Sequence, residues 1–252
     1  MWGRAAVIAL CCSAGAQCAQ TAAQIMDEVH RRARSENFRY EGRITTRRAN
    51  GAKEEKAWLC ERLGPPGASK MLLRFLEPAD IRGVALLVWN HIQKASDIWL
   101  YTPSLGRHRR IAQQDRSSRF AGTDFSYEDF EESDPSLWDY AELQDSQEGG
   151  EACWRMTGRR NTPNRSQYDK YWIWVSKDKM TVLRIDKWRG GQVARRLTMH
   201  ALDLRQGIWT PMRIEIADLA QKSATTLQLA DARYNQRLAE SHFTLEGMKE
   251  SR

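Results

Sequence analysis

The sequence has few of the residues that build a structural metal site. Its 252 residues include only five cysteines and five histidines. The histidines are scattered along the chain, and no two cysteines stand in a Cys-x-x-Cys pattern. Zinc sites are built from closely spaced ligands of these types. We therefore predict no metal site and no cofactor.

Long apolar runs and the short motifs of common enzymes are also missing. After the N-terminal segment the longest apolar run has six residues, 84–89, whereas a membrane-spanning helix needs about 20. There is no Gly-x-Ser-x-Gly elbow and no phosphate-binding Gly-x-x-x-x-Gly-Lys loop. A Ser-x-x-Lys pattern occurs at 176–179, but it lies between two predicted strands, where a charged hairpin is expected. We predict no catalytic residue.

Basic residues exceed acidic ones by a small margin, 39 to 32, for a formal net charge of +7. The excess favours anionic partners. The basic residues at 107–110 and 159–160 would suit nucleic acid, but a mixed-charge surface explains them equally well. For an exported protein, anionic lipid head groups are the more accessible partner. We predict no nucleic-acid partner, and we interpret the acidic residues at 124–129 as a solvated loop.

The N-terminal segment is typical of a secretory signal peptide. Arg4 supplies the positive charge, residues 5–12 form an apolar run, and small residues follow at 13–16. We expect cleavage after Ala16 or Ala19. Residues 1–19 are then the leader, residues 20–252 form a single domain, and the mature protein is periplasmic.

Export changes what the remaining cysteines, Cys60 and Cys153, could do. A bacterial periplasm oxidises suitably placed thiols, which predicts a disulfide between them if their strands are neighbours. The alternative is two separately buried thiols, because spacing along the chain does not fix geometry.

Hydrophobic periodicity predicts one helix followed by many short strands. Apolar residues recur at helical spacing over 22–33, and from residue 38 the pattern alternates as in a strand. An Asn50-Gly51 turn then predicts a hairpin. We predict strands at 38–47, 53–63, 70–76, 83–90, 97–101, 107–111, 152–159, 170–175, 182–188, 192–202, 212–217 and 224–234. The stretch 113–146 is predicted to be a long loop with helical turns at 126–130 and 135–140, and it is a candidate lid. The fold class is mainly β (α+β): one strongly curved antiparallel sheet with an N-terminal helix and helical loop insertions.

Ten tryptophans are many for a chain of this length. Residues 170–175 are apolar on both faces, so this strand should be covered on both sides. These side chains could form an ordinary core or line a concave apolar cavity. The candidate lining residues are Trp58, Leu73, Phe75, Leu87, Trp89, Trp99, Tyr101, Trp172 and Trp174.

Three consecutive stretches resemble one known family. They are FLEPADIRGVALL at 75–87, DIWLYTP at 97–103, and RHRRI at 107–111 followed by FAGTDFSYED at 120–129. In this order they resemble the outer-membrane lipoprotein-sorting protein family, in its LolA-like and mostly uncharacterised branch. We expect the resemblance to extend over the whole mature chain.

The resemblance implies a fold similar to LolA and LolB, which is an unclosed antiparallel β-barrel whose helices cover an apolar cavity. It implies a monomeric, non-enzymatic carrier that binds the acyl chains of a lipoprotein or lipid and hands them toward the outer membrane. An RND-type exporter or an outer-membrane acceptor would be its partner. Two alternatives stay open: a non-catalytic accessory subunit of an envelope transporter, and an exported enzyme acting on lipid or envelope glycan.

Overall fold

The computed structural model describes residues 20–92, 94–132, 135–161 and 166–249. The predicted signal peptide, residues 1–19, lies outside them. The described residues form one α-helix, α1 (Ala22–Arg32), and one sheet of thirteen strands. The strands are β1 (Asn37–Arg47), β2 (Lys53–Leu63), β3 (Lys70–Glu77), β4 (Ala85–Trp89), β5 (Asp97–Thr102), β6 (Arg107–Arg110), β7 (Trp138–Glu148), β8 (Glu151–Arg160), β9 (Lys170–Ser176), β10 (Val182–Arg189), β11 (Gln192–Arg205), β12 (Ile208–Asp218) and β13 (Ser223–Tyr234).

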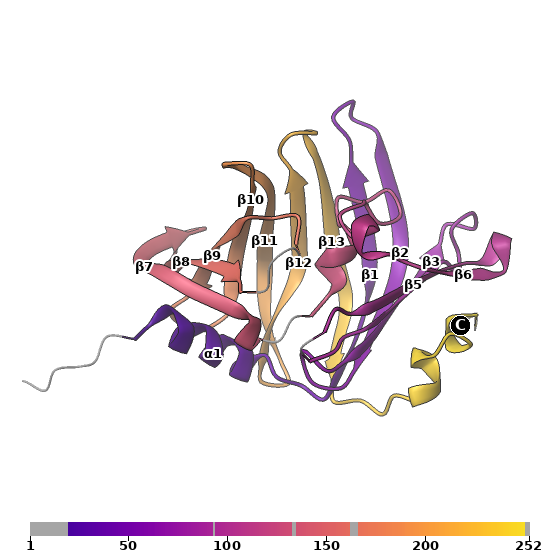
Figure 1. Ribbon diagram of the computed structural model, residues 1–252, viewed down its shortest axis with the longest axis horizontal. Coiled ribbons are helices and arrows are strands. Elements are labelled where there is room, and N and C mark those ends of the chain that lie inside the picture. The colour runs from indigo at the N-terminus through magenta and orange to yellow at the C-terminus, as the bar shows by residue number, and fades with distance from the viewer. Residues whose placement is uncertain (1–19, 93, 133–134, 162–165, 250–252) are drawn as a thin grey trace, which may run out of the picture.

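The sheet consists of two meanders that meet at its centre. Its order is β6-β5-β4-β3-β2-β1-β13-β12-β11-β10-β9-β8-β7, and every pair is antiparallel. The central pair joins β1 to β13, with Phe38 opposite Tyr234. The sheet curves strongly, and β6 and β7 lie at its two far ends (Figure 1). The predicted fold, mainly β with an unclosed curved sheet and an N-terminal helix, is confirmed.

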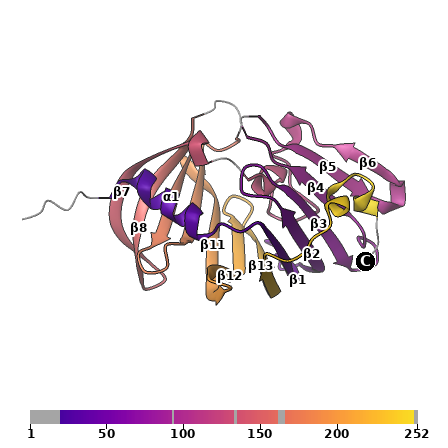
Figure 2. The same cartoon turned by 90° about the horizontal axis from the view of Figure 1, so that it is seen from below.

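Helix α1 forms where the spacing of apolar residues predicts it. Thr21 caps its N-terminus, since its side chain accepts a hydrogen bond from the Gln24 backbone while the Gln24 side chain bonds back to Thr21. Its buried residues are Ala22, Ile25, Met26 and Val29. They pack on Tyr171, Ile173 and Val175 of β9, and the helix crosses β7 and β8 (Figure 2). We call the sheet face that α1 covers the inner face.

The middle of the chain differs from the predicted loop. Its second part is β7, the edge strand beside β8. A β-bulge between Ala141 and Gln144 places Glu142 at a positive φ of 54°. The bulge lets Trp138, Tyr140 and Leu143 all pack in the α1 cluster, so the strand lacks a simple alternation. The lid prediction is therefore wrong for residues 138–146.

The first part of this stretch covers the inner face of the other meander. It contains the short 3₁₀ turns η2 (Gln113–Asp115) and η3 (Tyr127–Phe130), and a third turn, η4 (Pro135–Leu137), precedes β7. Phe120, Phe125 and Tyr127 are buried against side chains of β1 to β5, β12 and β13. The turn predicted at 126–130 is confirmed.

The outer face is covered in part by the chain's own C-terminal segment. Two 3₁₀ turns, η5 (Glu240–Phe243) and η6 (Gly247–Lys249), lie beyond β13. Phe243 and Met248 are buried against Leu72 and Leu87 of β3 and β4. The Arg74 guanidinium donates to the Gly247 carbonyl oxygen at 2.8 Å, which holds this segment in place.

Candidate functional site

A cavity lies on the inner face between α1, η3 and strands β7 to β11. Its volume is about 290 Å³, which is close to the lower end of the range for small-molecule sites, about 300–1,000 Å³. One side is apolar and one end is charged. The apolar wall is formed by Met26, Trp138, Tyr140, Tyr171, Ile173, Val182, Ile185 and Leu197, and the polar end by His30, Glu128, Asp129, Glu131, Arg160 and Lys187.

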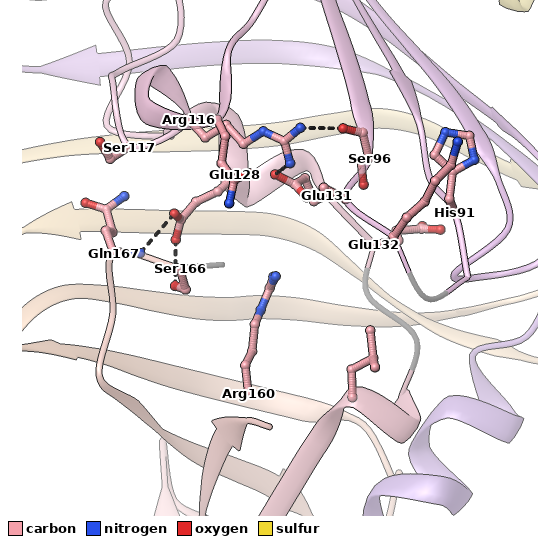
Figure 3. A pocket seen from close by; sticks show the side chains of 14 residues that line it. His91, Ser96, Arg116, Ser117, Glu128, Glu131, Glu132, Arg160, Ser166 and Gln167 are labelled. Carbon is pink, nitrogen blue, oxygen red and sulfur yellow. Dashed lines mark hydrogen bonds and ion pairs between the residues drawn. The ribbon is translucent and has the colours of Figure 1, made fainter. Parts of the chain in front are cut away.

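A second, polar pocket of about 190 Å³ adjoins the charged end. Glu128, Glu131 and Arg160 line both spaces. In Figure 3, Arg160 points into the space below Arg116 and Glu131, and the Glu128 carboxylate lies to one side of it. Together the two spaces have an apolar end under α1 and a charged end between η3 and β8.

Asp129 is a buried carboxylate at this end and is paired with a cation. Its carboxylate is 4% exposed and forms an ion pair with Lys187. It also accepts hydrogen bonds from the Ser126 backbone N–H and hydroxyl at 2.6 and 2.7 Å. Burial would raise the pKa of Asp129, but Lys187 and Ser126 together outweigh it and hold the pKa below its usual value.

The pKa values of Glu128 and Glu131 shift in the opposite direction, upward. Glu128 accepts hydrogen bonds from the Ser166 hydroxyl at 3.0 Å and from the Gln167 backbone N–H at 3.2 Å, and burial raises its pKa. Glu131 pairs with Arg116 at 2.9 Å, yet burial raises the pKa of Glu131 as well. Both carboxyl groups therefore take up protons more readily than an exposed glutamate.

Three side chains that line the two spaces have a buried nitrogen without a hydrogen-bond partner: Arg116 and Arg160, each at Nε, and His30 at Nδ1. Arg160 lies over the Trp138 ring, with 5.3 Å between the guanidinium carbon and the ring centroid. Its Nε is buried and makes no hydrogen bond, and the same holds for Nδ1 of His30. Burial lowers the pKa of His30, which favours its neutral form.

Comparison with protein families assigns the chain to a family. A family model described only as "-like: Uncharacterized protein" matches residues 67–250, more than two thirds of the sequence. The chain belongs to this family. No curated protein matches its sequence.

Comparison with solved structures shows which fold this chain has. An outer membrane lipoprotein-sorting protein domain from Vibrio parahaemolyticus superposes with a TM-score of 0.85 at 23% identity, covering 91% of this chain and 98% of that chain. A DUF1329 family protein from Desulfovibrio piger gives 0.85 at 22% identity, covering 90% and 97%. A LolA superfamily protein from Nitrosomonas europaea gives 0.72 at 19% identity, covering 91% and 100%. The chain has the LolA-like fold that its motifs indicate.

In this family member the predicted lining residues belong to three separate clusters. Trp58, Leu73 and Phe75 face inward, but they are buried beneath the segment that contains Phe120. Four others lie on the outer face near the C-terminal segment: Leu87, Trp89, Trp99 and Tyr101. Trp172 and Trp174 pack on the outer face of β9. Within the described ranges, none of the nine lines the cavity.

Strand alternation separates the cavity residues from their outward-facing neighbours, but it does not say which of the two sets faces inward. In β9, Tyr171 and Ile173 face inward while Trp172 and Trp174 face outward, because neighbouring side chains point to opposite faces. The prediction from aromatic content selected the outward-facing pair, Trp172 and Trp174. The inward set includes Ile185 of β10, which is paired with Ile173.

The predicted disulfide is wrong. Cys60 and Cys153 are both buried, free thiols. Six strands separate β2 from β8 in the sheet, and the two thiols lie in different apolar clusters on opposite faces. Burial raises the pKa of the Cys60 thiol.

The acidic stretch at 124–129 is not a solvated loop. Asp124 is fully buried and Glu128 is 7% exposed. Across the described residues, no group of three or more His, Cys, Asp or Glu could hold a metal ion. No helix in the part of the chain that the structure describes is long and apolar enough to span a membrane.

Proposed function

We propose that this protein is a periplasmic carrier that shelters the acyl chains of a lipoprotein or lipid on the way to the outer membrane. The observation that carries the proposal is the cavity between α1 and the inner face, with its wall of eight apolar and aromatic side chains. Each CH₂ group of an acyl chain costs about 0.8 kcal/mol in water. An acyl chain that crosses an aqueous compartment therefore needs such a shelter.

The fold supports the same proposal. One structural neighbour is named as a lipoprotein-sorting domain and another as a LolA superfamily protein. The predicted leader at 1–19 would bring the chain to the periplasm. A monomer that receives its cargo from an RND-type exporter and delivers it to an outer-membrane acceptor fits this location.

The cavity favours a carrier over the two alternatives. An accessory subunit needs no internal apolar space, whereas this inner face has one. An enzyme would need a nucleophile or a paired acid and base at the cavity. Instead, Asp129 is held by Lys187, and Glu131 is held by Arg116. Glu128 accepts hydrogen bonds from the Ser166 hydroxyl and the Gln167 backbone.

A fluorescent ten-carbon acyl probe with a neutral end tests the proposal. We expect saturable binding to the wild type and at least tenfold weaker binding to Ile185→Glu, because a charge would then lie in the apolar wall. Trp172→Glu is the matched control, since Trp172 lies on the outer face of the neighbouring strand and binding should stay within twofold.

Circular dichroism would check that both variants fold. Absence of saturable binding to the wild type would overturn the carrier function. Equal probe affinity for the wild type and a folded Ile185→Glu would exclude this cavity as the binding site. Release of a cleaved product from a bound ester lipid would favour the enzyme.

A further inference from the structure

Several cations at the charged end of the cavity are already used in ion pairs. Arg116 is paired with Glu131, and Lys187 is paired with Asp129. A third cation, Arg195, lies 3.5 Å from Asp129 and 3.6 Å from Asp218. Arg160, by contrast, forms no ion pair with any residue that the structure describes. Glu131 attracts it from beyond ion-pair distance, so a ligand anion at contact would be its first ion-pair partner among these groups.

The sheet holds Arg160 where the apolar and polar spaces meet. It is the last residue of β8 and lies opposite Trp138 of β7 in the strand register. Its guanidinium rests over the Trp138 ring, and that ring forms part of the apolar wall. Attraction between the cation and the ring holds the guanidinium at this position. Its N–H groups match the geometry of a carboxylate or phosphate for bidentate bonding.

The neighbouring acids do not block an anion at this position. Glu131 is held by Arg116, and Glu128 is held by the Ser166 hydroxyl and the Gln167 backbone. Burial raises the pKa of both glutamates, so each gives up its negative charge more readily than an exposed glutamate when an anion binds beside it. His30, whose buried Nδ1 makes no hydrogen bond, lines the same cavity from α1.

We propose that the cavity binds an amphiphile with an anionic head group, and that Arg160 pairs with the carboxylate or phosphate of that head group while the acyl chain lies along the wall under α1. This rests on the carrier function proposed above. Among the cargoes proposed above, it favours lipids that carry an acidic group at the depth of the Trp138 ring. Neutral amphiphiles of equal length bind by their chain alone.

Displacement of the neutral fluorescent probe by three ten-carbon ligands tests the proposal: decanoic acid, decyl phosphate and decanol. For the wild type we expect the acid or the phosphate to displace the probe at a concentration at least tenfold lower than decanol. This advantage should shrink as salt rises from 20 to 500 mM. The stronger of the two anions indicates whether a fatty acid carboxylate or a lipid phosphate is the preferred head group.

Arg160→Gln should remove the advantage of the anion and leave decanol displacement unchanged. Arg159→Gln is the matched control, because Arg159 is the preceding residue of β8 and is exposed. Equal displacement by acid, phosphate and alcohol in the wild type would overturn the proposal, whether or not the variants fold. So would an equal loss in both arginine variants. A wild type that binds no probe overturns the carrier function itself.

Discussion

Asp124 shows how a single buried carboxylate positions the site. It accepts hydrogen bonds from the Ser223 and Thr225 hydroxyls of β13 at 2.5 and 2.8 Å and pairs with Arg119 at 3.0 Å. These bonds attach the segment that ends in η3 to the inner face of the sheet. Because Glu128 and Asp129 follow within that segment, the charged end of the cavity depends on this attachment.

The buried pair of Asp129 and Lys187 leads to a prediction about stability. Asp129→Asn should lower the free energy of unfolding at pH 7 by about 3–5 kcal/mol, because it leaves the Lys187 ammonium buried without its counter-charge. Urea unfolding measures this. Asp203→Asn is the control, since its partner Arg205 is 44% exposed and the loss there should stay below about 1 kcal/mol.

The same pair predicts a pH dependence. The pKa of Asp129 is lowered in the folded state, so its stabilisation is present above the pKa of an unfolded aspartate and is lost as pH falls through the folded pKa. Wild-type stability should therefore fall on acidification by more than that of Asp129→Asn. Parallel stability curves for the two proteins between pH 7 and pH 3 would contradict this assignment.

At the scale of elements, the sequence predicted best those strands whose apolar and polar residues alternate regularly. The hairpin of β1 and β2 and the strands β8 to β13 have regular patterns and turns, and they were predicted within a few residues. β7 was missed because the bulge at Glu142 brings Leu143 to the same face as Tyr140. The cavity was missed because the sequence does not say which face of β9 the helix covers; only the fold decides between Tyr171 and Trp172.

Helix α1 forms one wall of the cavity, so weakening its packing should affect both stability and binding. Ile25 is fully buried in the cluster that α1 forms with β8 and β9. Ile25→Ala should lower the free energy of unfolding by about 2–5 kcal/mol and weaken acyl-probe binding. Thermal unfolding and probe titration measure the two effects.

Asp27→Ala, on the exposed side of the same helix, is the control for this prediction and should change stability by less than about 0.5 kcal/mol. Full probe affinity in a destabilised Ile25→Ala protein would show that α1 does not form the binding wall.

At the scale of the molecule, each of the two open sheet edges carries charges of one sign. The β6 edge is basic and the β7 edge is acidic. β6 exposes Arg107, Arg109 and Arg110, and β7 exposes Asp139, Glu142 and Asp145. Like charges oppose the pairing of an edge with the same edge of a second copy. We expect a monomer at 150 mM salt over 10–200 μM protein, measured by sedimentation velocity. Replacing the three acidic residues of β7 by serine should promote self-association, and a wild-type dimer paired through β7 would contradict the argument.

The central pair of β1 and β13 also determines how the molecule responds to force. The two strands leave the sheet at the same end, where Phe38 lies opposite Tyr234. Tension applied through these ends loads one cross-strand hydrogen bond at a time, so the seam should unzip at low force. The hydrogen bond between the Thr46 and Thr225 hydroxyls crosses this pair of strands near its far end and should break last. The protein is therefore mechanically weak along the line where its two meanders meet, a direction in which a translocating or proteolytic machine could open it easily.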